Sequence, residues 1–129
     1  MPAITENDLK AEIKNNRLSS IYFLYGKETF LCLHYADRIA SAAVGTESAD
    51  FNLHRFNGFD HSVDEAIIGI SQAPVFADRK CVVLCDYDIP SLDSGDREKL
   101  MDIIEHPYDD TVLIFCFSSV ELYQKNPDG

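Results

Sequence analysis

Four consecutive residues, Gly26, Lys27, Glu28 and Thr29, follow an apolar stretch and precede a helical pattern, as a phosphate-binding loop does. Such a loop reads G-x-x-x-x-G-K-[ST]: its glycines let backbone N–H groups surround the phosphates, its Lys contacts phosphate oxygens, and its hydroxyl holds Mg²⁺. Here Gly26 stands alone, and Glu28 occupies the place of the hydroxyl, so that Thr29 comes one position late. Because a carboxylate beside a triphosphate is electrostatically unfavourable, we predict that this loop binds no nucleotide.

The other half of a nucleotide site would be an acidic residue that follows a buried strand. Asp86 follows the apolar segment 81–85 and matches that outline. An acid at a strand end is common in any α/β protein, so Asp86 alone indicates little. The alternative that stays open is a small P-loop-like nucleotide-binding protein or NTPase that uses Lys27, Thr29 and Asp86.

The other residue types that serve in catalytic or metal sites form no recognisable pattern. The four histidines are scattered, and the sequence has no His-x-x-x-His, Cys-x-x-Cys or G-x-S-x-G motif. On one strand, at ~3.3 Å per residue, Cys81 and Cys85 would lie about 13 Å apart, too far for a disulfide or a shared metal. We expect four reduced core thiols, no metal, no cofactor and no catalysis by this chain, and a cytoplasmic protein.

The composition limits the classes of partner. A chain of 129 residues suffices for one domain, and 46% hydrophobic with 26% charged residues is typical of a globular protein. The formal net charge of -11 disfavours direct binding to nucleic acid or to an anionic membrane, since both attract clustered Lys and Arg. No apolar stretch is long enough to span a membrane, and the first residues lack the apolar core of a signal peptide.

Alternating strand and helix patterns must position any site. Apolar runs rich in β-branched and aromatic residues predict strands at 20–25, 51–56, 80–85 and 111–117. Helical spacing predicts helices after Thr5, over 28–43, after the capping box Ser62–Glu65, and over 96–105 before Pro107. Strands that are apolar on both faces and alternate with helices indicate an α/β fold with a mostly parallel sheet flanked by helices. We expect one domain over residues 1–129.

The helical patterns also predict which side chains face the core. Over 28–43 the inward stripe is Leu31, Tyr35, Ile39 and Ala42, and Gly45 is a natural C-terminal cap. In the other helices the expected inward residues are Leu9 and Ile13, then Val63, Ala66, Ile67 and Ile70, and finally Leu100, Ile103 and Ile104.

The segment 71–80, SQAPVFADRK, carries two adjacent bulky apolar residues, Val75 and Phe76, among polar and charged ones. Two interpretations are open. In one, Phe76 packs under the sheet. In the other, Gln72, Val75 and Phe76 form an exposed anchor, in which the amide makes hydrogen bonds and the apolar side chains fill a pocket on a partner.

The ordered set of these segments resembles the N-terminal domain of the delta subunit family of bacterial DNA polymerase III, the clamp-loader subunit that opens the sliding clamp. The resemblance runs through LKAEIKNNRLSSIYFLYGKETFL, DFNLHRFNGFD, SVDEAIIGISQAPVFADRKCVVLCD and TVLIFCF. It implies an AAA+-type, P-loop-like fold with a degenerate phosphate loop, which agrees with the residues of the loop itself. Members of the family are longer, so the resemblance also implies that the chain is a fragment of a longer protein.

The same resemblance implies a partner and a site. The anchor of the family is a pair of adjacent bulky apolar residues, matched by Val75 and Phe76, although Val stands where Leu or Phe is usual. With Gln72 and Pro74 the turn reads Q-x-P-V-F, close to the broader clamp-binding pattern. The chain is thus expected to bind and help open the sliding clamp (the beta subunit) during DNA replication, without binding ATP. It would meet the other clamp-loader subunits of the DNA polymerase III holoenzyme through C-terminal regions that this sequence does not contain.

Overall fold

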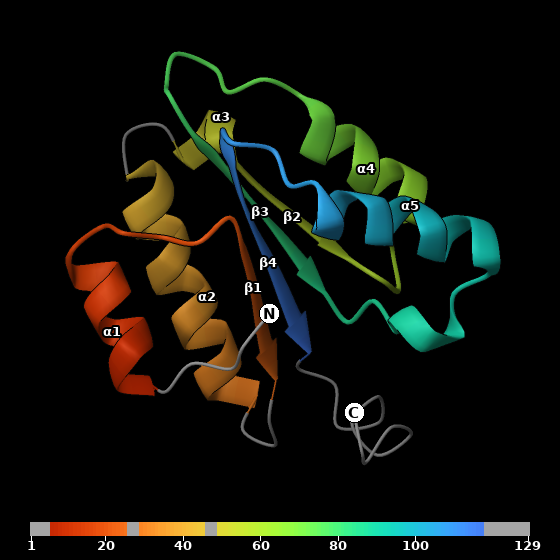
Figure 1. Ribbon diagram of the computed structural model, residues 1–129, viewed down its shortest axis with the longest axis horizontal. Coiled ribbons are helices and arrows are strands. Elements are labelled where there is room, and N and C mark those ends of the chain that lie inside the picture. Colours follow the sequence, from red (N-terminus) through yellow and green to blue (C-terminus); the bar gives the residue numbers. More distant parts are fainter. Residues whose placement is uncertain (1–5, 26–28, 46–48, 118–129) are drawn as a thin grey trace.

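A four-stranded parallel sheet, in the order β1-β4-β3-β2, forms the centre of the molecule. The computed structural model describes residues 6–25, 29–45 and 49–117. The strands are β1 (Ile21–Tyr25), β2 (Leu53–Asn57), β3 (Lys80–Cys85) and β4 (Thr111–Phe117). The helices are α1 (Glu6–Lys14), α2 (Thr29–Val44), α3 (Ala49–Asn52), α4 (Val63–Ser71) and α5 (Ser94–Glu105), with a 3₁₀ turn η1 (Ile89–Ser91). In Figure 1, α1 and α2 cover one face of the sheet, and α4 and α5 cover the other.

The two inner strands, β3 and β4, are buried on both faces. Alternate residues of each strand contribute to two separate cores. Cys81, Val83 and Ile114 pack under α1 and α2, whereas Val82 and Phe115 pack under α4 and α5. The uninterrupted apolar runs of these strands follow from this double burial, and they confirm the strands predicted at 80–85 and 111–117, as well as the parallel α/β fold.

Because all three strand pairings are parallel, the sheet has an amino edge, where every strand begins, and a carboxyl edge, where every strand ends. The segment 72–79 enters β3 at the amino edge, and α3 enters β2 at the same edge. β1 ends at the carboxyl edge, and Asp86 follows β3 at the same edge. Asp86 and the segment 72–79 therefore lie at opposite edges of the sheet.

The strand predicted at 51–56 is wrong at its start. Phe51 and Asn52 belong to the single-turn helix α3, and the strand runs from Leu53 to Asn57. The physical reason is tertiary: the Asn52 side chain turns inward and bonds to the backbone of Val75, 23 residues further along the chain. Local apolar alternation contains no signal for such a contact.

The inward stripe predicted for the second helix is also partly wrong. Tyr35 and Ile39 are buried as expected, but Leu31 is 37% exposed. The face of α2 that meets the sheet is completed by small residues, since Ala36 and Ala40 are almost fully buried. Small side chains let a helix approach a sheet closely, and a pattern weighted toward large apolar residues misses them. Gly45 does cap the helix, with φ +70 and its N–H donating to the carbonyl of Ser41 at 2.9 Å.

Side-chain caps set the helix starts on the opposite face. The Ser62 hydroxyl accepts a hydrogen bond from the Glu65 N–H at 3.2 Å, as the predicted capping box requires, and α4 starts at Val63. Asp93 accepts from the Asp96 N–H at 2.8 Å, so α5 begins two residues before the expected position 96. The proposed first cap, Thr5, lies outside the described residues.

Candidate functional site

The connection between α4 and β3, residues 72–79, contains the four residues of the expected anchor. Phe76 is 100% exposed and Val75 is 40% exposed. Gln72 is also exposed, and Pro74 is half-buried. The interpretation in which Phe76 packs under the sheet is therefore wrong, and the exposed arrangement is the observed one.

The backbone at Phe76 has φ +53, in the left-handed region. A residue with a Cβ is seldom found there, and for a bulky side chain the conformation is unfavourable unless neighbouring structure holds it. The Phe76 side chain cannot supply that support, since all of it faces solvent. The support has to come from groups that bind the backbone of the turn.

Asn52 binds the middle of the turn. Its Nδ2 donates to the Val75 carbonyl at 2.8 Å, and its Oδ1 accepts from the Val75 N–H at 2.6 Å. One carboxamide thus satisfies both backbone groups of the residue that precedes Phe76. Asn52 is only 1% exposed, so water does not compete for these bonds.

Lys80 holds the start of the turn. This first residue of β3 is buried, and its Nζ donates to the carbonyls of Ile70 and Gln72, where α4 ends. The last carbonyls of a helix lack intrahelical partners and carry partial negative charge, which makes them suitable acceptors for an ammonium group. Burial lowers the pKa of Lys80, and the nearby carboxylate of Asp110 opposes that shift.

Arg79 holds the end of the turn. Its guanidinium donates to the carbonyl of Ala43 at 3.0 Å and to that of Ala42 at 3.1 Å, both in the last turn of α2. It also donates to Oδ1 of Asn16 at 2.8 Å, in the connection between α1 and β1. The turn is consequently attached at its start, middle and end, while Val75 and Phe76 project outward.

Sequence reasoning found the exposed residues of this turn and missed those that support it. The sequence patterns place Arg79 next to a strand, Lys80 at the first position of that strand and Asn52 in another strand, and they give none of the three a supporting role. A Lys that directly precedes a fully apolar segment can indicate a supporting role, because its ammonium group must find hydrogen-bond acceptors if the strand is buried. Asn52 carries no comparable local signal.

The candidate nucleotide site comprises Lys27, Thr29 and Asp86. Gly26, Lys27 and Glu28 lie outside the described residues, and Thr29 is the first residue of α2. Asp86 follows β3 with φ +60, and its N–H donates to the Cys116 carbonyl at 2.8 Å. In the described ranges, no group of three or more His, Cys, Asp or Glu side chains could hold a metal ion.

All four cysteines are free thiols. Three are buried, and Cys85 is half-buried. Cys85 and Cys116 are partners in the β3–β4 register, and a hydrogen bond to Cys116 lowers the pKa of the Cys85 thiol. The same bond, together with burial, raises the pKa of the Cys116 thiol.

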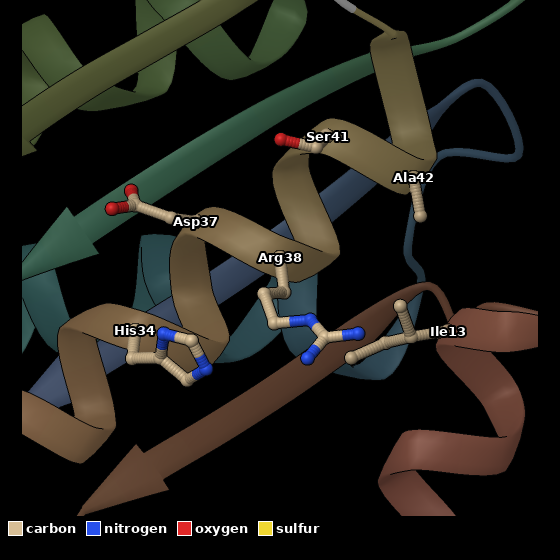
Figure 2. Close-up of a pocket in the computed structure, with 6 residues that line it drawn as sticks. All are labelled: Ile13, His34, Asp37, Arg38, Ser41 and Ala42. Carbon is tan, nitrogen blue, oxygen red and sulfur yellow. The ribbon is translucent and has the colours of Figure 1, made fainter.

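A shallow hollow of about 380 Å³ lies on the outer side of α2, next to α1. Figure 2 shows its lining side chains, which come from one residue of α1 and five of α2: Ile13, His34, Asp37, Arg38, Ser41 and Ala42. The polar groups in Figure 2 do not converge on one point. The Asp37 carboxylate instead pairs with the guanidinium of Arg55 in β2 at 2.7 Å. The hollow is open to solvent and lacks the enclosed, convergent lining of a ligand site.

No helix in residues 6–25, 29–45 or 49–117 is long and apolar enough to cross a membrane.

Comparison with known proteins identifies relatives of this chain. The chain is 31% identical over 99 residues to DNA polymerase III subunit delta of Bacillus subtilis, an alignment that covers 77% of this chain and 27% of that protein. Its fold matches the Bacillus subtilis DNA clamp loader delta protein with a TM-score of 0.76 at 23% identity, covering 95% of this chain and 40% of that one.

A second solved structure, a DNA polymerase III gamma subunit-related protein from Thermotoga maritima, matches with a TM-score of 0.61 at 11% identity. That match covers 91% of this chain and 43% of the solved one. The two structures confirm the AAA+-like α/β fold, and the chain spans less than half the length of each relative. The family model for the DNA polymerase III delta subunit matches residues 22–126. The chain belongs to the DNA polymerase III delta subunit family.

Proposed function

We propose that residues 1–129 form a single degenerate AAA+-type domain of a clamp-loader delta subunit, which binds the sliding clamp and helps to open it during DNA replication. Gln72, Pro74, Val75 and Phe76 are the contact residues. The observation that carries this proposal is the full exposure of Phe76 on a turn that is held at three points. Burial of a Phe side chain contributes about 1.5–3 kcal/mol of favourable free energy, which Phe76 forgoes while it faces water. A partner that buries this side chain would recover that free energy.

The ordered backbone of the turn bears on how the domain could help to open the clamp. A bound protein shifts an equilibrium between closed and open clamps only by the difference of its affinities for the two states. An anchor whose backbone is already ordered loses little conformational entropy on binding, which raises its affinity for either state of the clamp. For the domain to help open the clamp, the anchor must in addition bind the open clamp more tightly than the closed clamp.

The domain acts in this proposal without ATP, without catalysis and without direct contact to DNA or membrane. Its sequence replaces the hydroxyl of a phosphate loop with Glu28, and its net charge is -11. The longer relatives contain regions beyond the matched segment, and equivalent regions would make the contacts with the other clamp-loader subunits. The assembly would work in the cytoplasm.

A calorimetric titration of the chain into the sliding clamp, with and without Mg-ATP, tests the proposal. We expect saturable binding to the clamp that Mg-ATP leaves unchanged, and no saturable heat when Mg-ATP is added to the chain alone. A micromolar affinity for Mg-ATP that Lys27→Ala abolishes would instead support the nucleotide-binding alternative with Lys27, Thr29 and Asp86. Absence of any clamp binding would reject the proposed function.

A further inference from the structure

We propose that Asn52 is a positioning residue for the clamp contact: its carboxamide fixes the backbone of Val75 and thereby the direction of the Phe76 side chain. The inference rests on the proposed function. Asn52 ends α3 directly before β2, while Val75 lies before β3, so the contact joins the entrances of two neighbouring parallel strands. Figure 1 shows α3 and the connection from α4 to β3 at the same end of the sheet.

The pair of bonds requires a carboxamide. Oδ1 accepts from the Val75 N–H at 2.6 Å while Nδ2 donates to the Val75 carbonyl at 2.8 Å, which is how a neighbouring strand would bind that residue. Asp offers two acceptors and no donor when ionised, and Ala offers neither. Because Asn52 is buried, water cannot freely replace its carboxamide as the hydrogen-bond partner of the Val75 backbone when Asn52 is substituted.

The bonds at Val75 act where the turn needs support. Lys80 and Arg79 hold its two ends, at Gln72 and at α2. Between them, Phe76 adopts φ +53 with a side chain that packs on nothing. Fixing the residue immediately before Phe76 removes the freedom that would otherwise let the backbone return to a more favourable conformation.

This role predicts a specific loss in binding. If the turn samples other conformations, only the fraction with Phe76 projecting outward can bind, and the apparent Kd rises by the inverse of that fraction. We expect Asn52→Ala to weaken clamp binding by about 10-fold through such a shift in population. The domain should still fold, since Asn52→Ala leaves the apolar side chains of both cores unchanged.

A double-mutant cycle with the full chain tests the inference. Asn52→Ala, Phe76→Ala and the double variant are titrated against the sliding clamp. If Asn52 acts through Phe76, it weakens binding about 10-fold in the parent and by less than about 2-fold once Phe76 is gone, because the two effects are coupled. Hydrogen exchange supplies a second reading: the Val75 amide should exchange faster in Asn52→Ala, with the β3 amides unchanged.

The chain offers a matched control in Asn57→Ala. Oδ1 of Asn57 also accepts from two backbone N–H groups, those of Phe59 at 3.0 Å and Asp60 at 2.8 Å, but at the carboxyl edge of the sheet. Its removal should leave the clamp affinity within about 2-fold of the parent. If Asn52→Ala fails to fold, the near-isosteric Asn52→Asp replaces it, with the donor lost and the acceptor kept.

Asn52→Asp also provides a pH reading that general damage would not give. Below its pKa the new carboxyl group carries a proton and can donate to the Val75 carbonyl, so clamp affinity should recover relative to the parent as pH falls. Parent-like clamp affinity of the Asn52 variants, beside a weakened Phe76→Ala, overturns the positioning role and leaves the proposed function intact. An unaffected Phe76→Ala overturns the proposed anchor and this inference together.

Discussion

At the scale of single residues, the candidate site is an exposed aromatic group held in place by buried polar ones. Phe76 makes none of the contacts that would keep it in its left-handed conformation. Asn52 and Lys80, both almost fully buried, bind the backbone on either side of Pro74 instead. The residues proposed to contact the clamp are therefore different from the residues that hold the backbone of the turn, and substitutions can test the two roles separately.

Phe76→Ala should weaken binding to the sliding clamp by roughly 30-fold, since a buried aromatic anchor typically carries about 2 kcal/mol of an interface. Val75→Ala should cost less, because fewer carbons are buried. Phe76→Ala should not shift the Tm by more than about one degree, since a side chain already in water loses no folded-state contacts. Calorimetric titration and thermal melts of the same samples give both values.

Phe59→Ala is the matched control for this prediction. Phe59 is 73% exposed, but it follows β2 at the carboxyl edge of the sheet, away from the turn. The same loss of an exposed aromatic ring should there leave clamp affinity unchanged. Equal weakening by Phe59→Ala and Phe76→Ala would mean that the measured loss is not specific to the turn, and unfolding of Phe76→Ala would mean that its side chain belongs to the core.

At the scale of helices and strands, local sequence determined some elements and tertiary contacts determined others. The segments 80–85 and 111–117 could be predicted because strands buried on both faces need uninterrupted apolar runs. The start of β2 could not, because Asn52 leaves the strand to bind a turn far away in the sequence. Composition and resemblance predict the turn at 72–76, but they do not predict the left-handed φ of Phe76, which no local preference favours.

The packing of α1 against β1 gives a prediction in alkaline solution. The buried Tyr22 hydroxyl donates to Oε1 of Glu12 in α1 at 2.6 Å and accepts from the Ser19 N–H at 2.9 Å. Burial, reinforced by the bond to Glu12, raises the pKa of Tyr22 to about 12. In the unfolded chain the same phenol has a pKa of about 10. The pKa of Tyr22 is higher in the folded chain than in the unfolded chain. The stabilisation of the folded state by the protonated Tyr22 is therefore fully present below pH 10 and is lost as pH rises toward 12.

Tyr22→Phe removes this titration. The free energy of unfolding of the parent should fall more steeply between pH 10 and 12 than that of the variant, by about 1–3 kcal/mol over the interval, as a shift of about two pKa units allows. Burial likewise raises the pKa of Tyr87 to about 12, so Tyr87→Phe should behave in the same way. Denaturant unfolding at several pH values makes the measurement, and parallel curves for parent and variant would refute the assignment.

At the scale of the whole molecule, the parallel sheet separates two surfaces. Ligands of open α/β sheets usually bind at the carboxyl edge, where β1 ends and Asp86 follows β3. The proposed clamp contact uses the amino edge, where α3 and the turn before β3 meet. The loss of nucleotide chemistry that we propose at one edge would therefore leave the supports of the turn at the other edge unchanged.

Charge is the other property of the whole molecule, and it bears on DNA. The net charge is -11, with 11 Lys and Arg against 22 Asp and Glu. Several cations are already engaged: Arg55 pairs with Asp37 at 2.7 Å, and Lys99 pairs with Asp64 at 2.8 Å. Lys80 is buried under the turn. A surface of this kind repels a polyanion, because binding to the phosphate backbone depends on clustered cations that displace its counterions.

We therefore expect the chain alone to show no saturable binding to duplex or primed DNA at about 0.15 M salt, where the Debye length is about 8 Å and only close charges interact. Fluorescence anisotropy of labelled DNA, titrated with the chain alone and with the chain plus sliding clamp, makes the measurement. Any binding of the chain to DNA that requires the clamp should weaken with Phe76→Ala, since the clamp is then the only link between the chain and DNA. Tight, salt-sensitive binding by the chain alone would show that its cations form a cluster despite the net charge, and DNA would then be a direct partner of this domain.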